Sequence, residues 1–126
     1  MIDRSVALMD IRTHVVETKL ATPITTAIHN ANRMWHLLVR VTDGRGCDGI
    51  GHSFAFSRPL VMAMEAVALD LARAIQGRAF SSPEKAWDAL MQAATFIGRT
   101  GLATMAIAAI DTALWDAAAR RSDLPL

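Results

Sequence analysis

MWHLLVRVTDGRGCDGIGHSFA, residues 34–55, is the most informative segment of this 126-residue sequence. Its first nine residues are mostly β-branched or large and apolar, which predicts a strand. The turn DGRG at 43–46 supplies residues that tolerate positive φ, and a return strand follows it, so the segment is expected to form a β-hairpin. Gly49 and Gly51 in the return strand mark either a bulge or a place where another backbone approaches closely.

The residues before this hairpin predict one more strand. Met9–Leu20 contains β-branched residues interleaved with polar ones at an imperfect period of two. Ala21–Arg33 then turns polar, carries Pro23 and has no sustained period, so it is expected to be a loop. A loop of thirteen residues is longer than an ordinary connection in a small domain, and such loops are commonly functional.

The residues after the hairpin predict helices. Of the 23 alanines, 18 follow Pro59, whereas β-branched residues gather in the first half. Three helices are expected: one capped by Ser57 and ended by Gly77, one from Ser82-Pro83 to near Gly98, and one capped by Thr100 that runs from Gly101 to about Ser122. The predicted fold class is α+β, a three-stranded antiparallel meander followed by a helical bundle, with strands and loops over 1–56 and helices over 57–122.

The third expected helix is apolar nearly all the way round. Leu102, Ile107 and Trp115 do not fall on one narrow stripe, and alanine fills most of the remaining positions. A helix of this kind needs cover on most of its sides. A three-stranded sheet and two helices can cover only part of it, so we expect a further domain or a partner to pack against it.

Composition excludes several classes of protein. Thirteen Lys and Arg against twelve Asp and Glu give a net charge of +1, which argues against a nucleic-acid or anionic-membrane partner. Cys47 is the only cysteine, so no internal disulfide is possible, and the cytoplasm is the expected location. The N-terminus lacks a basic region followed by an apolar stretch, and polar residues interrupt Leu102–Ala119, so neither secretion nor a membrane span is expected.

Few residues are arranged for nucleophilic, phosphate or metal chemistry. The sequence lacks GxSxG, and its two GxG segments do not open a helix after a strand, as a phosphate cradle requires. Asp111 and Asp116 lie on the third expected helix and point about 140° apart, so they cannot share one ion. We expect Asp116 to pair with Arg120, and Asp111 to accept hydrogen bonds from neighbouring elements.

None of the four histidines has the spacing of metal ligands, because neither HxH nor HExxH occurs. His14 and His36 are expected on the solvent faces of strands. His29 falls in the long loop and His52 beside the glycine-rich strand, where an imidazole can hydrogen-bond a ligand near neutral pH.

Several short segments, taken together, resemble one enzyme family. They are LATP at 20–23, GHSFAF at 51–56, GRTGL at 98–102, IDTALWD at 110–116 and LPL at 124–126. Their order and spacing resemble the N-terminal region of the mandelate racemase/muconate lactonizing branch of the enolase superfamily. The IDTALWD segment is the most specific, and the loops resemble mandelate racemase most closely, with acid-sugar dehydratases of the talarate/galactarate type also near.

The resemblance implies that residues 1–126 form a capping domain that packs over the mouth of a β/α barrel. In that family the barrel supplies three carboxylate ligands to magnesium, a lysine base and, in some members, a histidine paired with an aspartate. The sequence ends at Leu126, where family members continue into the barrel, and Lys19 and Lys85 are its only lysines. We therefore expect no catalytic residue and no metal ligand in this chain, which alone is expected to be inactive.

In such an enzyme two loops of the cap close over the substrate, shape its pocket and exclude water. By the resemblance, the substrate-binding residues are Ile24, Thr26, His52 and Phe54. Ile24 and Phe54 are expected to form an apolar wall, which favours a carboxylate substrate with an apolar or aromatic group and a mandelate-racemase-like racemase. The reaction would begin by abstraction of the proton α to the carboxylate, with magnesium stabilising the resulting enediolate.

Two alternatives stay open. One is the cap of an acid-sugar dehydratase of the talarate/galactarate type, since racemisation and β-elimination share their first step. The other is a free-standing oligomerisation or binding module, whose apolar third helix would be buried between copies. The partners expected for the enzyme are the barrel domain of the same protein, a small carboxylate substrate and further copies in a homo-oligomer.

Overall fold

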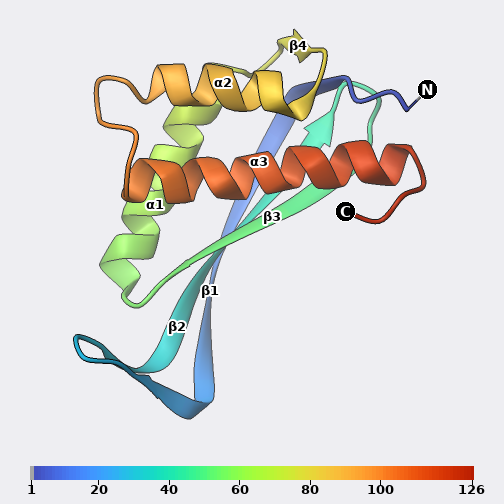
Figure 1. Cartoon of the computed structure of the whole chain (residues 1–126). Helices are drawn as coiled ribbons and strands as arrows, with labels where there is room; N and C mark the ends of the chain where they lie inside the picture. The colour runs from blue at the N-terminus through green and yellow to red at the C-terminus, as the bar shows by residue number, and fades with distance from the viewer. Residues whose placement is uncertain (1) are drawn as a thin grey trace.

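The computed structural model describes residues 2–126, in which two helices pack against one face of an antiparallel sheet and a third helix packs on those two (Figure 1). The strands are β1 (Val6–Thr25), β2 (Asn30–Asp43), β3 (Asp48–Ala55) and β4 (Ala79–Phe80), and the helices are α1 (Arg58–Ala72), α2 (Pro83–Ala93) and α3 (Leu102–Arg121). The sheet order is β3-β2-β1-β4. The predicted α+β class and the meander are confirmed, and β4 adds a short fourth strand beside β1.

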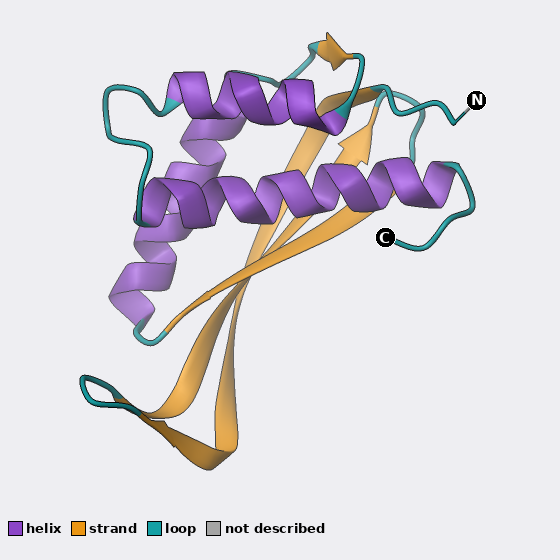
Figure 2. Cartoon of the chain, in the orientation of Figure 1, coloured by secondary structure: helices purple, strands orange, loops and turns teal. Residues whose placement is uncertain are grey.

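The long loop predicted over Ala21–Arg33 is wrong, because most of it belongs to β1 and β2. Pairing continues to Thr25 and Asn30, so only residues 26–29 form the turn. Within this hairpin the segment 20–23 has no register partner, and it forms a bulge that includes Pro23, a residue without an amide to donate to the ladder. The hairpin extends beyond the helices (Figure 2), and its tip bends back toward the β3–α1 junction (Figure 1).

The first helix begins as predicted and ends earlier. Ser57 caps α1, and its hydroxyl accepts the amide three residues on at 3.4 Å. The predicted end at Gly77 is wrong, since α1 stops at Ala72 and the chain turns so that Gln76 forms a bridge with Leu8. The chain therefore leaves the helix to pair with β1 before it reaches Gly77.

The other two helices also differ at one end. The predicted end of the second helix near Gly98 is wrong, because α2 stops at Ala93 and the chain continues in turns. The predicted cap Thr100 is wrong as well: Gly101, with φ of 58°, is the N-cap of α3. Glycine adopts this left-handed conformation at little cost, whereas threonine does not.

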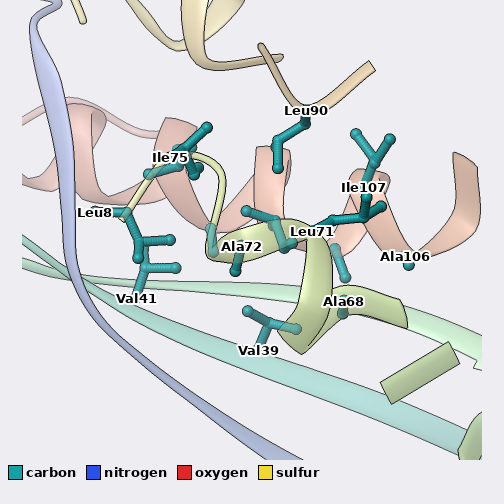
Figure 3. Packing of buried hydrophobic residues seen from close by; sticks show 14 of the residues in the cluster. Leu8, Val39, Val41, Ala68, Leu71, Ala72, Ile75, Leu90, Ala106 and Ile107 are labelled. Atoms are coloured by element: carbon teal, nitrogen blue, oxygen red, sulfur yellow. The ribbon is translucent and has the colours of Figure 1, made fainter. Parts of the chain in front are cut away.

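The core lies between the sheet and the helices. Leu37, Val39 and Val41 on the inner face of β2 are all 0% exposed. Figure 3 shows Leu8 and Val41 of the sheet close to Ile75, which follows α1. Because β2 alternates in this way, it presents one apolar face to the helices and the other to the outside.

Strand β3 meets α3 with no side chain between the two backbones. A Cβ atom built on Gly49 would lie 1.9 Å from the Ala113 carbonyl oxygen, and one built on Gly51 would lie 1.7 Å from that of Ala109. The β2–β3 register is continuous through both glycines. Of the two predicted alternatives, the glycines therefore serve close approach of another backbone and form no bulge.

Two polar contacts fix the C-terminal half of α3. Asp116 Oδ2 accepts the Ile50 amide at 2.8 Å and the Arg120 Nε at 2.9 Å, so the predicted Asp116–Arg120 pair is confirmed. Arg121 Nη1 donates to Asp43 Oδ2 at 2.6 Å, and Asp43 is 1% exposed. The other oxygen of Asp43 accepts two amides of the β2–β3 turn at 2.9 Å, so one carboxylate joins the turn to the end of α3.

Helix α3 is covered on about half of its surface. It is the one helix within residues 2–126 that is long and apolar enough to cross a membrane by length and composition, and half of that apolar window is buried inside the domain. A buried core helix satisfies the same criteria. Ala108 is exposed and Trp115 is half-buried, so the side of α3 turned away from the sheet keeps apolar surface open.

Gly51→Ala is expected to lower the free energy of unfolding by about 3 kcal/mol or more, because its methyl group would clash with backbone rather than with a movable side chain. Urea unfolding of the chain measures this change. Gly44→Ala is the matched control: a Cβ there meets only the side chains of Ala7, at 3.4 Å, and Met9, at 4.0 Å, and its cost is expected to stay within about 0.5 kcal/mol. Equal stability of the two variants would contradict the side-chain-free contact.

Candidate functional site

The tip of the β1–β2 hairpin touches the junction between β3 and α1. The His29 ring lies 5.1 Å from the Phe56 ring, measured between centroids, with the planes inclined by 35°. His29 belongs to the hairpin turn and Phe56 follows the last residue of β3. The structure thus brings the turn that follows LATPITTA (20–27) against GHSFAF (51–56), and the predicted substrate-binding residues lie on these two segments.

Thr26 organises the hairpin turn. Its Oγ1 accepts the amides of Ile28 at 3.3 Å and His29 at 2.9 Å, and its own amide donates to the His29 carbonyl at 2.7 Å. Short polar side chains commonly close turns in this way. The hydroxyl therefore has a structural role here, and its predicted contact with substrate stays a prediction.

Ile24 belongs to the hairpin and Phe54 to β3, the two segments that meet at the His29–Phe56 contact. Ile24 is half-buried and pairs with Ala31 next to the bulge, whereas Phe54 is 37% exposed near the end of β3. Phe54 and Phe56 meet edge to face, with ring centroids 5.8 Å apart. This pair links the outer face of β3 to the hairpin tip through His29.

A shallow hollow of about 210 Å³ opens beside these aromatic rings. It is lined by residues of β3, α1 and α3 and of the segments beside them: Phe54, Ala55, Phe56, Leu60, Met64, Leu102 and Met105. No charged side chain lines it. Phe54 thus belongs to an apolar wall that also contains Phe56, which the sequence did not single out. Ile24, the other residue of the predicted wall, does not line this hollow, so its part in the wall stays a prediction.

His52 continues the row of rings along β3 and contacts a second histidine. Its ring is stacked 6.4 Å from Phe54 and 5.1 Å from His36, and its Nε2 lies 2.8 Å from His36 Nδ1. His36 Nε2 in turn lies 2.8 Å from Thr18 Oγ1. Partial burial, followed by repulsion from His36, lowers the pKa of His52 below its ordinary value.

His14 and His36 both lie on the outer face of the sheet, as the sequence predicted. His14 is exposed on the sheet, as expected, whereas His36 is half-buried and bonded on both ring nitrogens. The sequence placed both on solvent faces because alternation along one strand shows which face a residue occupies, but not which residue of the next strand lies beside it.

A metal site needs several ligand side chains close together. Residues 2–126 contain no group of three or more His, Cys, Asp or Glu side chains that could hold an ion. Magnesium prefers several oxygen ligands in octahedral geometry. The residues of this domain do not fit such a site.

The chain matches the family described as mandelate racemase / muconate lactonizing enzyme, N-terminal domain, over residues 8–126. It belongs to this family. The resemblance stated from the sequence is thereby confirmed, and so is the capping-domain fold that it implied.

Named relatives act on sugar acids. A 3,6-anhydro-alpha-L-galactonate cycloisomerase of Streptomyces coelicolor is 32% identical over 92% of this chain and 32% of that protein. An L-talarate/galactarate dehydratase of Salmonella typhimurium is 32% identical over 85% of this chain and 28% of that protein. The solved structure of an L-talarate dehydratase from a Polaromonas species, complexed with Mg and L-glucarate, has a TM-score of 0.76 and 31% identity, over 92% of this chain and 32% of that one. The chain thus spans about a third of the length of these relatives.

A second hollow, of about 390 Å³, lies between α2 and α3 of the capping domain. It is lined by Glu84, Trp87, Asp88, Asp111 and Trp115. Burial, and then the charge of Glu84, raises the pKa of Asp111 to about 6. The expectation that Asp111 accepts hydrogen bonds is wrong for residues 2–126, since its side chain faces this hollow and neighbouring elements offer it no donor.

Thr26→Val is expected to speed amide hydrogen exchange at Ile28 and His29 about fivefold, because each amide loses a hydrogen bond worth about 1 kcal/mol. Thr26→Ser is the control, since it keeps the accepting hydroxyl. Exchange measured by NMR distinguishes a turn-closing hydroxyl from one free to bind substrate. Unchanged exchange in Thr26→Val would contradict the structural role.

Asp111→Asn is expected to raise the unfolding midpoint at pH 7.5 and to leave it unchanged at pH 3.5. The folded carboxyl has a pKa of about 6 against an ordinary value of 3.8, so its contribution to stability is present below pH 4 and is lost as the pH rises through 6. The group is only half-buried, so the gain at pH 7.5 stays below about 1 kcal/mol.

Asp88→Asn is the matched control from the same hollow, because Asp88 is exposed and lies 3.7 Å from Lys85. Thermal unfolding at the two pH values measures both variants. A loss of stability in Asp111→Asn at pH 7.5 would show that the carboxylate is favoured where it lies.

Proposed function

We propose that this domain caps the active site of a magnesium-dependent enzyme that removes the proton α to the carboxylate of an acid sugar, leading to dehydration or cycloisomerisation. One observation carries the proposal: the similarity to sugar-acid relatives extends over 92% of the chain and includes both segments that meet at the His29–Phe56 contact. The acid-sugar alternative is thus favoured over a mandelate-racemase-like racemase.

The domain's own residues supply shape and shielding. The hairpin tip and the β3–α1 junction support each other through His29 and Phe56, and Thr26 holds the turn closed. A pair of braced segments of this kind can exclude water from a reacting carbanion and orient the far end of a substrate. Ile24, Thr26, His52 and Phe54 are the residues proposed to face the substrate.

Magnesium and the proton-transferring groups are proposed to lie outside this domain, on a β/α barrel of the same protein. The support is that residues 2–126 contain no metal-ligating group of the required size, whereas a relative's structure is complexed with Mg. When bound, the metal neutralises negative charge on the substrate carboxylate. The open side of α3, with Ala108 and Trp115, is the surface proposed to contact the barrel.

A second candidate is a racemase acting on an aryl or alkyl 2-hydroxy acid. The hollow beside Phe54 favours it, because the hollow carries no charged side chain and would leave several sugar hydroxyls without partners. A sugar acid remains compatible with this wall if its polar groups face the barrel and the two histidines of the outer sheet face.

The assay uses the whole enzyme that contains this domain, with galactarate, L-talarate, 3,6-anhydro-L-galactonate and mandelate as substrates. We expect turnover of a sugar acid, its loss on chelation with EDTA and its recovery with added magnesium. Turnover of mandelate alone would overturn the acid-sugar proposal in favour of the racemase. Inactivity on all four, together with a stable stoichiometric homo-oligomer of the 126-residue chain, would favour the binding module.

The isolated chain serves as the control and is expected to be inactive with all four substrates. A homo-oligomer of the whole enzyme and a cytoplasmic location are proposed as well, the second because Cys47 is a free thiol. Light scattering of the whole enzyme tests the first. A monomer would contradict it without affecting the proposed reaction.

A further inference from the structure

The outer face of the sheet carries a pair of bonded imidazoles. Gly51 and Ser53 face the helices, so His52 between them projects from the opposite face. His36 on the neighbouring strand meets it through the 2.8 Å contact between Nδ1 of His36 and Nε2 of His52. Within residues 2–126, Nδ1 of His52 has no hydrogen-bond partner, so this atom is open to a ligand.

The contact limits where protons can lie. One of the two facing nitrogens must carry hydrogen and the other must offer its lone pair. When both rings are neutral, they must therefore share one tautomer: both protonated on Nδ1, or both on Nε2. Thr18 accommodates either case, because its hydroxyl can donate to His36 Nε2 or accept from it.

One added proton fits this arrangement and a second does not. With one extra proton on the pair, the facing nitrogens still hold a single hydrogen between them, and Nδ1 of His52 is an N–H in either placement of the charge. A second proton would set two N–H groups against each other and break the contact. The pair thus takes up a single positive charge and offers a donor at Nδ1 of His52.

We propose that His36 is a positioning residue that fixes the proton on His52, so that the pair binds the carboxylate or hydroxyl end of the substrate through Nδ1 of His52 with a single positive charge. The inference rests on the proposed function, which supplies the anionic, hydroxylated substrate. It assigns to the cap a polar contact that the apolar wall beside Phe54 does not provide.

The two arginines on this face are paired with carboxylates, so the histidine pair is the group proposed to bind the anionic substrate. Arg12 of β1 and Arg40 of β2 lie farther along the outer face, where they pair with Asp10 and Asp48 respectively. Their charges are thereby compensated. On the other side of His52, toward the end of β3, lie the neutral rings of Phe54 and Phe56.

Two further histidines face the same region. His14 of β1 lies in the same row as His52 with Leu38 between them, since Leu38 pairs with both. His29 of the hairpin turn approaches from the other end and contacts Phe56. Neither makes a ring contact with His36 or His52.

The test is a pH titration of the 126-residue chain by NMR, with ring nitrogens assigned for all four histidines. We expect His36 and His52 to show the same single tautomer at pH 8 and to take up one proton jointly, with a second uptake more than about one pH unit lower. Independent titration of the two rings, or different tautomers at pH 8, would overturn the inference.

Variants of His36 separate positioning from packing. His36→Leu is expected to return His52 to a mixture of tautomers and to move its titration midpoint by about 0.5–1 pH unit. His36→Asn keeps a donor and acceptor near the Nδ1 position, so it is expected to preserve a single His52 tautomer without joint titration. His14→Leu is the matched control and should leave His52 unchanged. An unaltered His52 titration in His36→Leu would refute the positioning role.

The substrate part is tested in the whole enzyme. His36→Leu is expected to raise KM for the sugar acid about tenfold at pH values where the pair is charged, with kcat within about twofold, and His36→Asn is expected to restore most of the KM. An unchanged KM would refute substrate binding by the pair. If the enzyme fails on every sugar acid while the NMR signature is present, the proposed function fails and the proton-sharing pair stands.

Discussion

The contact between β3 and α3 is the constraint on which the rest of the domain depends. At Gly49 and Gly51 the strand presents no side-chain atom to α3. Ala109 and Ala113 on the facing helix present only methyl groups and backbone. Such close packing is possible only where small residues coincide on both elements. It brings Asp116 near enough to accept the Ile50 amide, and it allows Arg121 to reach the buried Asp43.

The same contact determines which residues form the candidate site. Side chains of a strand alternate between its two faces, so placing Gly51 against α3 places His52 and Phe54 on the outside. A slip that moved His52 into the place of Gly51 would turn the imidazole into a space that does not admit a methyl group. The spacing of the two glycines therefore determines both the packing between β3 and α3 and the exposure of the candidate binding residues.

Local patterns predicted the elements, and the failures came from contacts between elements. Ser57 and the Asp116–Arg120 pair were correctly predicted because their partners lie within one helical turn. Residues 21–33 were misjudged because their polar composition and Pro23 are also compatible with an exposed hairpin whose ladder is interrupted by a bulge. His36 was missed as the partner of His52 because their contact depends on the register between two strands.

The apolar wall and the sugar-acid relatives are reconciled by the geometry of the outer face. Phe54 lines the uncharged hollow and also stacks against His52, so the boundary between apolar and polar surface runs between adjacent outward residues of one strand. A ligand there meets an aromatic ring on one side and an imidazole donor on the other. Specificity for hydroxylated over aryl acids would then depend on the hydrogen bonds that the imidazole pair offers to hydroxyls rather than on the shape of the wall, because a sugar acid that leaves its hydroxyls unpaired against Phe54 loses hydrogen bonds to water.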